Sequence, residues 1–302
     1  MAISKWESAS LQFLDRLSLW YRQLLRQFGV KPKKRLGQHF LIDEAVLERI
    51  LSAAEISPGD IVVEVGPGLG TLTEGLAKRG AKVIAVELDS KLVPLLKKRL
   101  SDFPDVKIIS ADILKVNPRQ LLQTNLTTSE LFRGYKVIAN IPYYITSPVL
   151  RHFFEAQPWP TRMVVMVQKE VGEAIVAAPG KMRLISVRVQ FYSKPTIISY
   201  VPAASFYPPP KVDSVILRLD VYSEPPIGVA DAAGFFDIVM HGFSSPRKQL
   251  RNSLAHSLEM PPDQVSVFLE KAGIDGKRRA ETLTLEEWRE LWKVFAPLTK
   301  RL

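Results

Sequence analysis

The chain of 302 residues contains no cysteine, which excludes disulfides, thiolate nucleophiles and cysteine-ligated zinc and is typical of a reducing compartment. Its four histidines show no close ligand spacing, so we expect no metal site. No apolar run reaches the roughly 20 residues that a membrane span requires. Glu7 and Asp15 interrupt the N-terminus, which argues against a signal peptide. We therefore predict a cytoplasmic protein without membrane attachment.

The composition predicts a packed globular protein. Apolar residues make up 46% of the chain and charged residues 24%, and the length suits one large domain with a small one, or two medium domains. The formal net charge is +10. A basic excess of this size raises the expectation of a polyanionic partner.

Residues 1–30 form an N-terminal extension whose apolar residues recur at helical spacing. The positions that carry this pattern are Leu14, Leu17, Tyr21, Leu24, Leu25 and Phe28. The pattern predicts an amphipathic helix. Packing against the protein's own domain is the favoured interpretation. A membrane-surface helix and a partner-binding helix are the alternatives.

Strand-like and helix-like segments alternate from residue 41 to about 200, which is typical of an α/β domain with a mostly parallel sheet, and we place this domain at residues 31–222. Two β-rich segments joined by AASFYPPPKV predict a long-looped hairpin at the sheet edge. In such a sheet, ligands bind beyond the carboxyl ends of the strands. The expected strands are 61–66, 81–89, 106–112, 136–140 and 161–168.

A different pattern follows the sequence SEPPIG at 223–228, which we interpret as a linker. Every segment beyond it has apolar residues at helical period. Residues 229–302 are therefore predicted to form a small all-helical C-terminal domain.

A glycine-rich stretch, EVGPGLG at 64–70, follows the first predicted strand and opens a helix. The dinucleotide fingerprint G-x-G-x-x-G cradles a pyrophosphate, but here the third glycine comes one residue early. Glu64 would also repel a pyrophosphate, whereas it suits a ligand with a cationic ammonium end. A purely structural turn is the alternative interpretation.

Acidic residues end the next two strands. Glu87 comes about 20 residues after Gly66, where a carboxylate accepts hydrogen bonds from ribose hydroxyls. Asp112 ends the third strand, placed to accept from an adenine amino group, with Ile113 as an apolar wall. A ligand with a ribose, an adenine and an ammonium group but no phosphate is indicated. S-adenosylmethionine fits this description and NAD does not.

Together these motifs resemble the Rossmann-like class of S-adenosylmethionine-dependent methyltransferases. Asn140-Ile141-Pro142-Tyr143 is similar to the motif of enzymes that methylate amino nitrogens. More narrowly, the chain resembles the ribosomal RNA small-subunit adenine dimethyltransferase family over residues 33–290. The matching stretches are RLGQHFL (35–41), EVGPGLGTLT (64–73), ELD (87–89), AD (111–112), NIPYYITSPVL (140–150), QKEVGEAI (168–175), FYPPPKVDS (206–214) and FSSPRKQLRN (243–252).

The resemblance implies N6,N6-dimethylation of two adjacent adenosines near the 3′ end of small-subunit (16S) ribosomal RNA, as part of ribosome biogenesis. It implies that His39 and Leu41 contact the methionine end of S-adenosylmethionine, although the family often has asparagine at the position of His39. The remaining cofactor-binding residues that it implies are Gly66, Gly68, Glu87, Asp112 and Asn140.

The NIPY motif is the predicted catalytic segment. Asn140 and a main-chain carbonyl near Ile141 or Pro142 are expected to accept both N–H groups of the target adenine. Tyr143 is expected to stack on one face of that base, and Phe206 from the hairpin loop on the other. A turn with a capping amide is the structural alternative, and core packing is the default role for Tyr144.

Three clusters of basic residues are candidate RNA-binding surfaces. One, Lys33, Lys34 and Arg35, precedes the cofactor loop, and another, Arg247, Lys248 and Arg251, lies in the helical domain. A third run is formed by residues 277–279. A solvated basic face is the alternative for each cluster. With the catalytic interpretation they predict phosphate contacts to folded RNA, in a partly assembled 30S particle, by a monomeric protein.

Three other functions remain open at this point. The sister class that methylates an adenosine of large-subunit ribosomal RNA and confers macrolide resistance is the nearest. A non-catalytic RNA-binding assembly or transcription factor would not need the glycine loop, the acidic strand ends and the NIPY motif. A DNA adenine methyltransferase agrees less well with the full-length match.

Overall fold

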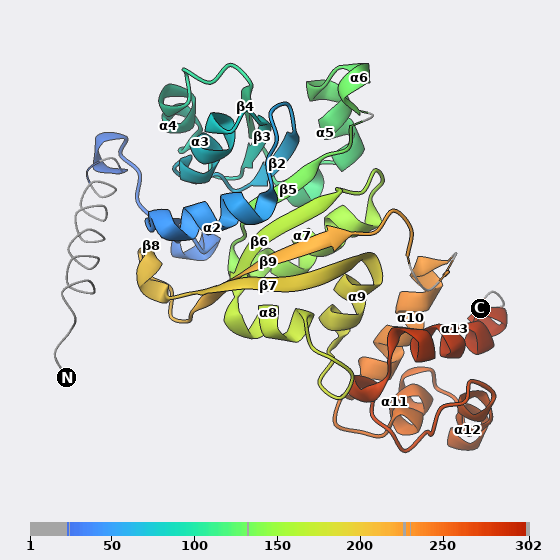
Figure 1. The fold of residues 1–302 in the computed structure, drawn as a ribbon. Coiled ribbons are helices and arrows are strands. Elements are labelled where there is room, and N and C mark those ends of the chain that lie inside the picture. The colour runs from blue at the N-terminus through green and yellow to red at the C-terminus, as the bar shows by residue number, and fades with distance from the viewer. Residues whose placement is uncertain (1–22, 24, 132, 226–227, 230, 300–302) are drawn as a thin grey trace, which may run out of the picture. The chain divides into compact units, whose positions relative to one another are not determined.

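The computed structural model describes residues 23, 25–131, 133–225, 228–229 and 231–299 (Figure 1). Contacts divide the chain into two compact units. Unit 1 comprises residues 1–172 and 196–221, and unit 2 comprises residues 173–195 and 222–302. Unit 2 thus contains, besides the helical region expected from the sequence, a segment that the sequence pattern groups with the sheet.

A seven-stranded sheet forms the framework of the fold, with the order β4-β3-β2-β5-β6-β9-β7. The five strands from β4 to β6 pair in parallel, β9 is antiparallel to β6, and β7 lies at the edge beside β9. The strands span β2 (Ile61–Val65), β3 (Lys82–Glu87), β4 (Val106–Ser110), β5 (Lys136–Asn140), β6 (Arg162–Gln168), β7 (Ser193–Val201) and β9 (Ser214–Val221).

The central strands are apolar because both faces of the sheet are covered. All five residues of β2 are buried, and so are the five interior residues of β6. Continuous burial of this kind is typical of parallel strands in α/β proteins. The predicted α/β fold with a mostly parallel sheet and added edge strands is confirmed.

The helices of unit 1 begin at recognisable caps. Asp43 caps α2 by accepting hydrogen bonds from the backbone N–H groups of Ala45 (3.0 Å) and Val46 (3.2 Å), and Asn117 caps α5 in the same way. The helices lying wholly in unit 1 are α2 (Glu44–Ala54), α3 (Thr71–Lys78), α4 (Val93–Arg99), α5 (Pro118–Asn125), α6 (Thr128–Leu131) and α7 (Thr146–Glu155).

A second, two-stranded sheet joins the N-terminal region to the loop before β9. Strand β1 (Phe40–Leu41) pairs antiparallel with β8 (Phe206–Tyr207). Most of the predicted N-terminal helix lies outside the described residues. Of the described part, Leu25 and Val30 are buried with Phe40 in one apolar cluster. The segment from Leu25 to Phe40 is thereby held against the apolar cluster of unit 1.

Unit 2 is helical, as the sequence pattern predicts. Its apolar core includes the buried side chains of Phe235, Phe236 and Trp288. Phe191 packs against Phe235 with ring centroids 4.9 Å apart, which explains why residues 173–195 group with this unit. The helices are α9 (Leu184–Tyr192), α10 (Ala232–Phe243), α11 (Leu250–Ser257), α12 (Pro262–Lys271) and α13 (Leu285–Thr299), and α8 (Lys169–Ile175) spans the boundary between the units.

Candidate active site

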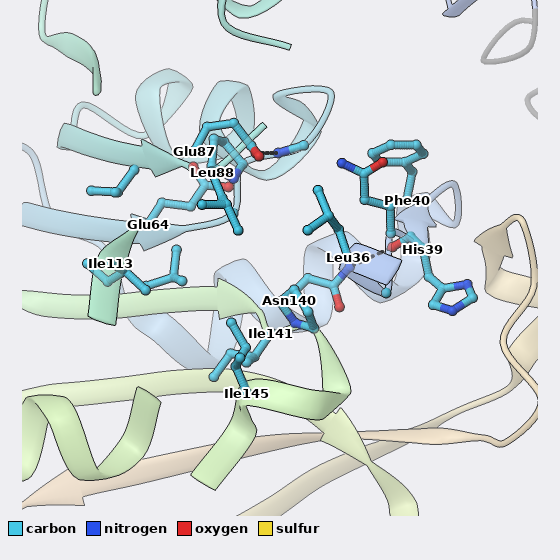
Figure 2. A pocket seen from close by; sticks show the side chains of 18 of the residues that line it. Leu36, His39, Phe40, Glu64, Glu87, Leu88, Ile113, Asn140, Ile141 and Ile145 are labelled. Carbon is cyan, nitrogen blue, oxygen red and sulfur yellow. Dashed lines mark hydrogen bonds between the residues drawn. The ribbon is translucent and has the colours of Figure 1, made fainter. Parts of the chain in front are cut away.

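A pocket in unit 1 lies at the carboxyl ends of β2, β3 and β5, where the sequence predicts a ligand site (Figure 2). The residues that line it come from five chain segments, which the fold brings together. Of the predicted site residues, the pocket contains His39, Leu41, Gly66, Gly68, Glu87, Asp112, Asn140, Pro142 and Tyr143.

The glycine loop allows a ligand to approach the backbone closely. Gly66 has φ +69° and Gly68 φ +60°, values that glycine adopts readily and other residues rarely. A Cβ added to Gly66 would meet no atom within 4 Å, so this glycine faces open space beside the pocket. A tight turn and a free approach are both required of a cofactor-binding loop.

Glu64 is a buried carboxyl in the pocket, at 1% exposure. Its Oε2 has no hydrogen-bond partner among the described residues. Burial raises the pKa of Glu64 to about 8, and the nearby charge of Glu87 adds to this shift. An unpartnered buried carboxyl is costly unless a ligand group satisfies it, and a cationic group would do so.

Glu87, at the end of β3, points into the same pocket (Figure 2). Its Oε2 accepts from the backbone N–H of Gly68 at 3.1 Å, and its Oε1 accepts from that of Asp89 at 2.7 Å. Burial raises the pKa of Glu87, and these backbone donors oppose the rise. Each oxygen keeps a further lone pair, so the carboxylate remains able to accept from two vicinal hydroxyls.

Asp112 follows β4 and caps the short 3₁₀ helix η2 (Ile113–Lys115). Its Oδ1 accepts from the backbone N–H of Leu114 at 3.1 Å, which fixes the carboxylate at the pocket wall. Ile113 beside it is 4% exposed and lines the pocket. A carboxylate next to an apolar wall can bind the amino group and the face of a purine.

Asn140 ends β5, and its side-chain amide has a defined orientation. The Nδ2 donates to the main-chain carbonyl of His39 at 3.0 Å. The amide oxygen is then the group left to accept a hydrogen bond from a substrate. His39 thus acts here through its backbone, while its imidazole points away from Glu64 and Glu87 and its Nδ1 lies 2.6 Å from the carbonyl of Pro208 (Figure 2).

Two main-chain carbonyls follow Asn140, and the structure distinguishes them. The Pro142 carbonyl accepts from the backbone N–H of Ile145 at 3.0 Å, in the turn that precedes α7. The backbone N–H of Ile141 donates to Met166 at 3.2 Å and anchors the segment to β6. Because the Pro142 carbonyl is already engaged, the Ile141 carbonyl is the better second acceptor.

The two tyrosines of the motif have different surroundings. Tyr143 is half-buried, its hydroxyl lies 2.7 Å from Oγ of the buried Ser214, and its ring stacks on His39 with centroids 5.9 Å apart. Tyr144 lines the pocket with 54% exposure. The core-packing role expected for Tyr144 is therefore wrong. A ring following a turn is not obliged to face the core, and here it lies over Gly37.

Phe206, expected to stack on the target base, does not line the pocket. Its side chain is 2% exposed and belongs to the apolar cluster of Leu41, Val46 and Ile216, because β8 pairs with β1 and turns Phe206 inward. Within the described part of the chain, the pocket is lined without it. Stacking of Phe206 on a base would require the β8 segment to move, so in this conformation Phe206 is a core residue.

The basic residues of the first cluster are not equivalent. Lys33 forms an ion pair with Asp89, with Nζ 2.7 Å from Oδ1, so its charge is already engaged. Lys34 and Arg35 are exposed and form no ion pair with any described residue. Lys34 and Arg35 therefore remain available for a polyanion, whereas Lys33 has a structural contact that sequence spacing could not reveal.

The basic group of unit 2 is also mixed. Arg247 and Lys248 are exposed, whereas Arg251 is half-buried and its Nε has no hydrogen-bond partner in the described part of the chain. In the 277–279 run, Arg278 is engaged by Glu287 at 3.0 Å between Nη2 and Oε2. Among the described residues, no helix is both long and apolar enough to cross a membrane, and no three acidic or histidine side chains form a metal-binding group.

Two site residues escape the motif analysis. Gln38 and Asp89 stand within the quoted stretches RLGQHFL and ELD, but spacing alone gives them no role. Gln38 Nε2 donates to Asp89 Oδ2 at 3.2 Å, which joins the two stretches at the pocket edge. Leu88, 47% exposed between Glu87 and Asp89, lines the pocket as an apolar surface.

Comparison with solved structures shows the same fold in proteins that modify RNA. A dimethyladenosine transferase from Plasmodium falciparum is similar with a TM-score of 0.71 and 26% identity, covering 86% of this chain and 98% of that one. The 23S rRNA methyltransferase ErmE is similar with a TM-score of 0.64 and 27% identity, covering 85% of this chain and 99% of that one.

Sequence comparison gives a closer relation. The ribosomal RNA small subunit methyltransferase A of Dehalococcoides mccartyi is 46% identical over 274 residues, which cover 91% of this chain and 92% of that protein. The family model described as ribosomal RNA adenine dimethylase matches residues 29–297. These findings confirm the resemblance drawn from the motifs. The chain belongs to the ribosomal RNA adenine dimethylase family.

Proposed function

We propose that this chain transfers methyl groups from S-adenosylmethionine to the N6 amino groups of two adjacent adenosines near the 3′ end of small-subunit ribosomal RNA. The observation that carries the proposal is the orientation of Asn140. Its amide nitrogen is held by the His39 carbonyl at 3.0 Å, which leaves the amide oxygen at the pocket as an acceptor for an amino group.

The residues of the NIPY segment prepare the target nitrogen. The lone pair of an adenine amino group is delocalised into the ring, so the nitrogen is a poor nucleophile. The amide oxygen of Asn140 and the carbonyl of Ile141 accept its two N–H groups and favour a pyramidal nitrogen. Positioning of this kind contributes up to about 7–11 kcal/mol, and the proton can leave after attack.

Tyr143 supplies the stacking face for the target base. Its ring lines the pocket, and the hydroxyl contact with Ser214 fixes its plane. Stacking of a base on an aromatic ring is worth about 1–3 kcal/mol, which helps to hold a base that has been turned out of its stack. Tyr144, also at the pocket, offers a second aromatic surface.

The pocket residues fit S-adenosylmethionine, which supplies an electrophilic methyl group on a sulfonium. Glu64 has an unpartnered buried oxygen for a cationic group. Glu87 retains lone pairs for the ribose hydroxyls, and Asp112 beside Ile113 suits the adenine. Gly66 leaves room for the ligand at the backbone.

The small ribosomal subunit is the preferred substrate over the large one. This preference is supported by the 46% sequence identity to a small-subunit methyltransferase, compared with 27% identity to a 23S rRNA methyltransferase. Lys34 and Arg35 in unit 1 and Arg247 and Lys248 in unit 2 are exposed cations for phosphates. We propose that the protein acts in the cytoplasm as a monomer on a partly assembled 30S particle, whose RNA it recognises by shape.

Labelled S-adenosylmethionine offered to unmethylated small and large ribosomal subunits tests the function. Label should enter two adjacent adenosines near the 3′ end of the small-subunit RNA. Asn140→Ala should abolish transfer while retaining the fold, and Asn117→Ala, which removes a helix cap at a residue outside the pocket lining, should remain active. Label in the large subunit alone would favour the sister class. No transfer to either subunit would support a binding protein.

A further inference from the structure

Asp89 occupies an unusual position for a carboxylate at the edge of a pocket. It is 3% exposed, yet it follows the ribose-binding strand end by only two residues. Its Oδ1 lies 2.7 Å from Nζ of Lys33, and its Oδ2 accepts from Nε2 of Gln38 at 3.2 Å. Its own backbone N–H donates to Oε1 of Glu87 at 2.7 Å. Asp89 therefore contacts the cofactor-binding carboxylate and the N-terminal loop at once.

The loop that Asp89 holds, residues 33–39, is folded back on itself. The backbone N–H of Lys33 donates to Oε1 of Gln38 at 2.8 Å, and Gly37, at φ +56°, donates its N–H to the Lys34 carbonyl at 3.0 Å. The Gln38 amide thus uses its oxygen within the loop and its nitrogen on Asp89. One side chain closes the loop and fastens it to the strand end.

The same loop carries the group that orients the catalytic amide. Residue 39 directly follows Gln38, and its carbonyl accepts from Nδ2 of Asn140. Residues 36–41 line the pocket. A continuous series of contacts therefore runs from Glu87 through Asp89 and Gln38 to the His39 carbonyl and Asn140. Displacing the loop would free the amide of Asn140 to rotate.

We propose that Asp89, with Gln38 and Lys33, is a positioning group that couples cofactor binding at Glu87 to the orientation of the catalytic amide of Asn140. The inference rests on the proposed methyl transfer and extends it to residues beyond those assigned to the cofactor and the target base. Hydrogen bonds from a bound ribose to Glu87 fix the carboxylate that accepts from the Asp89 backbone N–H. Asp89, held in this way, keeps the loop of residues 33–39 in place.

Burial and charge agree with this role. Burial acts to raise the pKa of Asp89, but the hydrogen bonds from Lys33, the Lys91 backbone and Gln38 outweigh it and lower the pKa. Asp89 is therefore ionised at neutral pH, and its partners must stay in place to offset its burial. An exposed surface ion pair has no such requirement, because water can replace either partner.

The test compares Asp89→Asn, Gln38→Ala and a matched control, Asp60→Asn, in the full chain. Asp60 pairs with Lys136 at 2.8 Å, and both lie at the amino ends of their strands, away from the pocket lining. For each variant the KM for S-adenosylmethionine and the kcat at saturating cofactor are measured with unmethylated small subunits, and thermal melting checks the fold.

Asp89→Asn should raise the KM for the cofactor about tenfold and lower kcat about tenfold. Gln38→Ala leaves the ion pair intact, so it should lower kcat by a similar factor while changing KM less than threefold. Asp60→Asn should leave both constants unchanged. Lys33→Arg, which keeps the charge, should retain activity that Lys33→Met loses.

Two results distinguish failure of this inference from failure of the proposed function. If the wild-type protein transfers no methyl groups, the proposed function itself is contradicted. An active wild type with Gln38→Ala at full kcat would overturn the coupling and leave the function intact. If Asp89→Asn does not fold, Gln38→Ala alone decides, because Gln38 is only half-buried and its loss leaves the Lys33–Asp89 pair in place.

Discussion

Glu64 should make cofactor binding release a proton. Its carboxyl is 1% exposed, its Oε2 is unpartnered among the described residues, and burial raises its pKa to about 8. At pH 7 the free protein therefore holds Glu64 protonated in a ratio of about ten to one. A bound cation favours the carboxylate, so binding lowers this pKa and expels the proton.

The magnitude follows from the linkage between pH and affinity. Because the free protein binds more protons than the complex, raising the pH strengthens binding. Between about pH 6 and pH 7.5 the affinity for S-adenosylmethionine should rise by up to tenfold per pH unit, or 1.36 kcal/mol, and it should level near pH 8. Glu64→Gln cannot ionise and should lose this dependence.

Calorimetry at pH 7 in two buffers with different ionisation enthalpies measures the protons released. Wild-type protein should release close to one proton on binding S-adenosylmethionine, and Glu64→Gln close to none. Equal heats for the wild type in both buffers would refute the assignment of Glu64 as the partner of the cation. Equal proton release in both proteins would assign the proton to another group.

The Glu64 carboxyl should also make the free energy of unfolding depend on pH. Its pKa is 4.5 in the unfolded chain and about 8 in the folded one, so the folded state holds a proton that the unfolded state lacks. Stability contributed by this proton is fully present below about pH 4.5 and is lost progressively as pH rises from there to about 8, by on the order of 4–5 kcal/mol in total. Denaturant unfolding should show a smaller loss in Glu64→Gln.

Three further predictions concern positions around the pocket. Ser214→Ala removes the partner of the Tyr143 hydroxyl, so kcat/KM should fall about threefold to tenfold, and Tyr143→Phe should give a similar loss with no further loss in the double variant. Gly66→Ala places a side chain at φ +69° and should destabilise the protein by about 1–2 kcal/mol in thermal unfolding. Replacing Lys34 and Arg35 by alanine should reduce the salt slope of RNA binding by about two, and an unchanged slope would exclude them from phosphate contact.

The sequence predicts the sheet and the acidic strand ends for one physical reason. A parallel strand buried on both faces is a continuous apolar run, so its end is visible where a polar residue interrupts it. Glu87 and Asn140 stand at such interruptions, and Asp112 comes two residues after β4. Parallel strands place these ends at one edge, so the pocket follows from the pattern alone.

Contacts that depend on tertiary pairing could not be predicted in this way. Phe206 is buried because β8 pairs with β1, across a separation of about 165 residues in sequence that no local pattern specifies. In the sequence Lys33 is one of a run of basic residues, and nothing near it indicates the ion pair that it forms with Asp89 in the fold. The carbonyl of His39 accepts from Asn140 while its imidazole Nδ1 lies beside the Pro208 carbonyl, and the sequence alone cannot separate the role of the backbone from that of the ring.

The charge of the pocket opposes the charge of the protein, and this difference has a functional consequence. The net charge of +10 attracts RNA to the surface, whereas Glu87 and Asp112, joined by Glu64 once a bound cation has ionised it, make the pocket acidic. An acidic pocket favours a cationic methyl donor, and it favours less the product left when a sulfonium loses its methyl group and becomes a neutral thioether. Methyl transfer thereby weakens the electrostatic hold on the spent cofactor. An enzyme that adds two methyl groups to each of two adenosines needs four such exchanges, so a pocket that discriminates by charge suits repeated use.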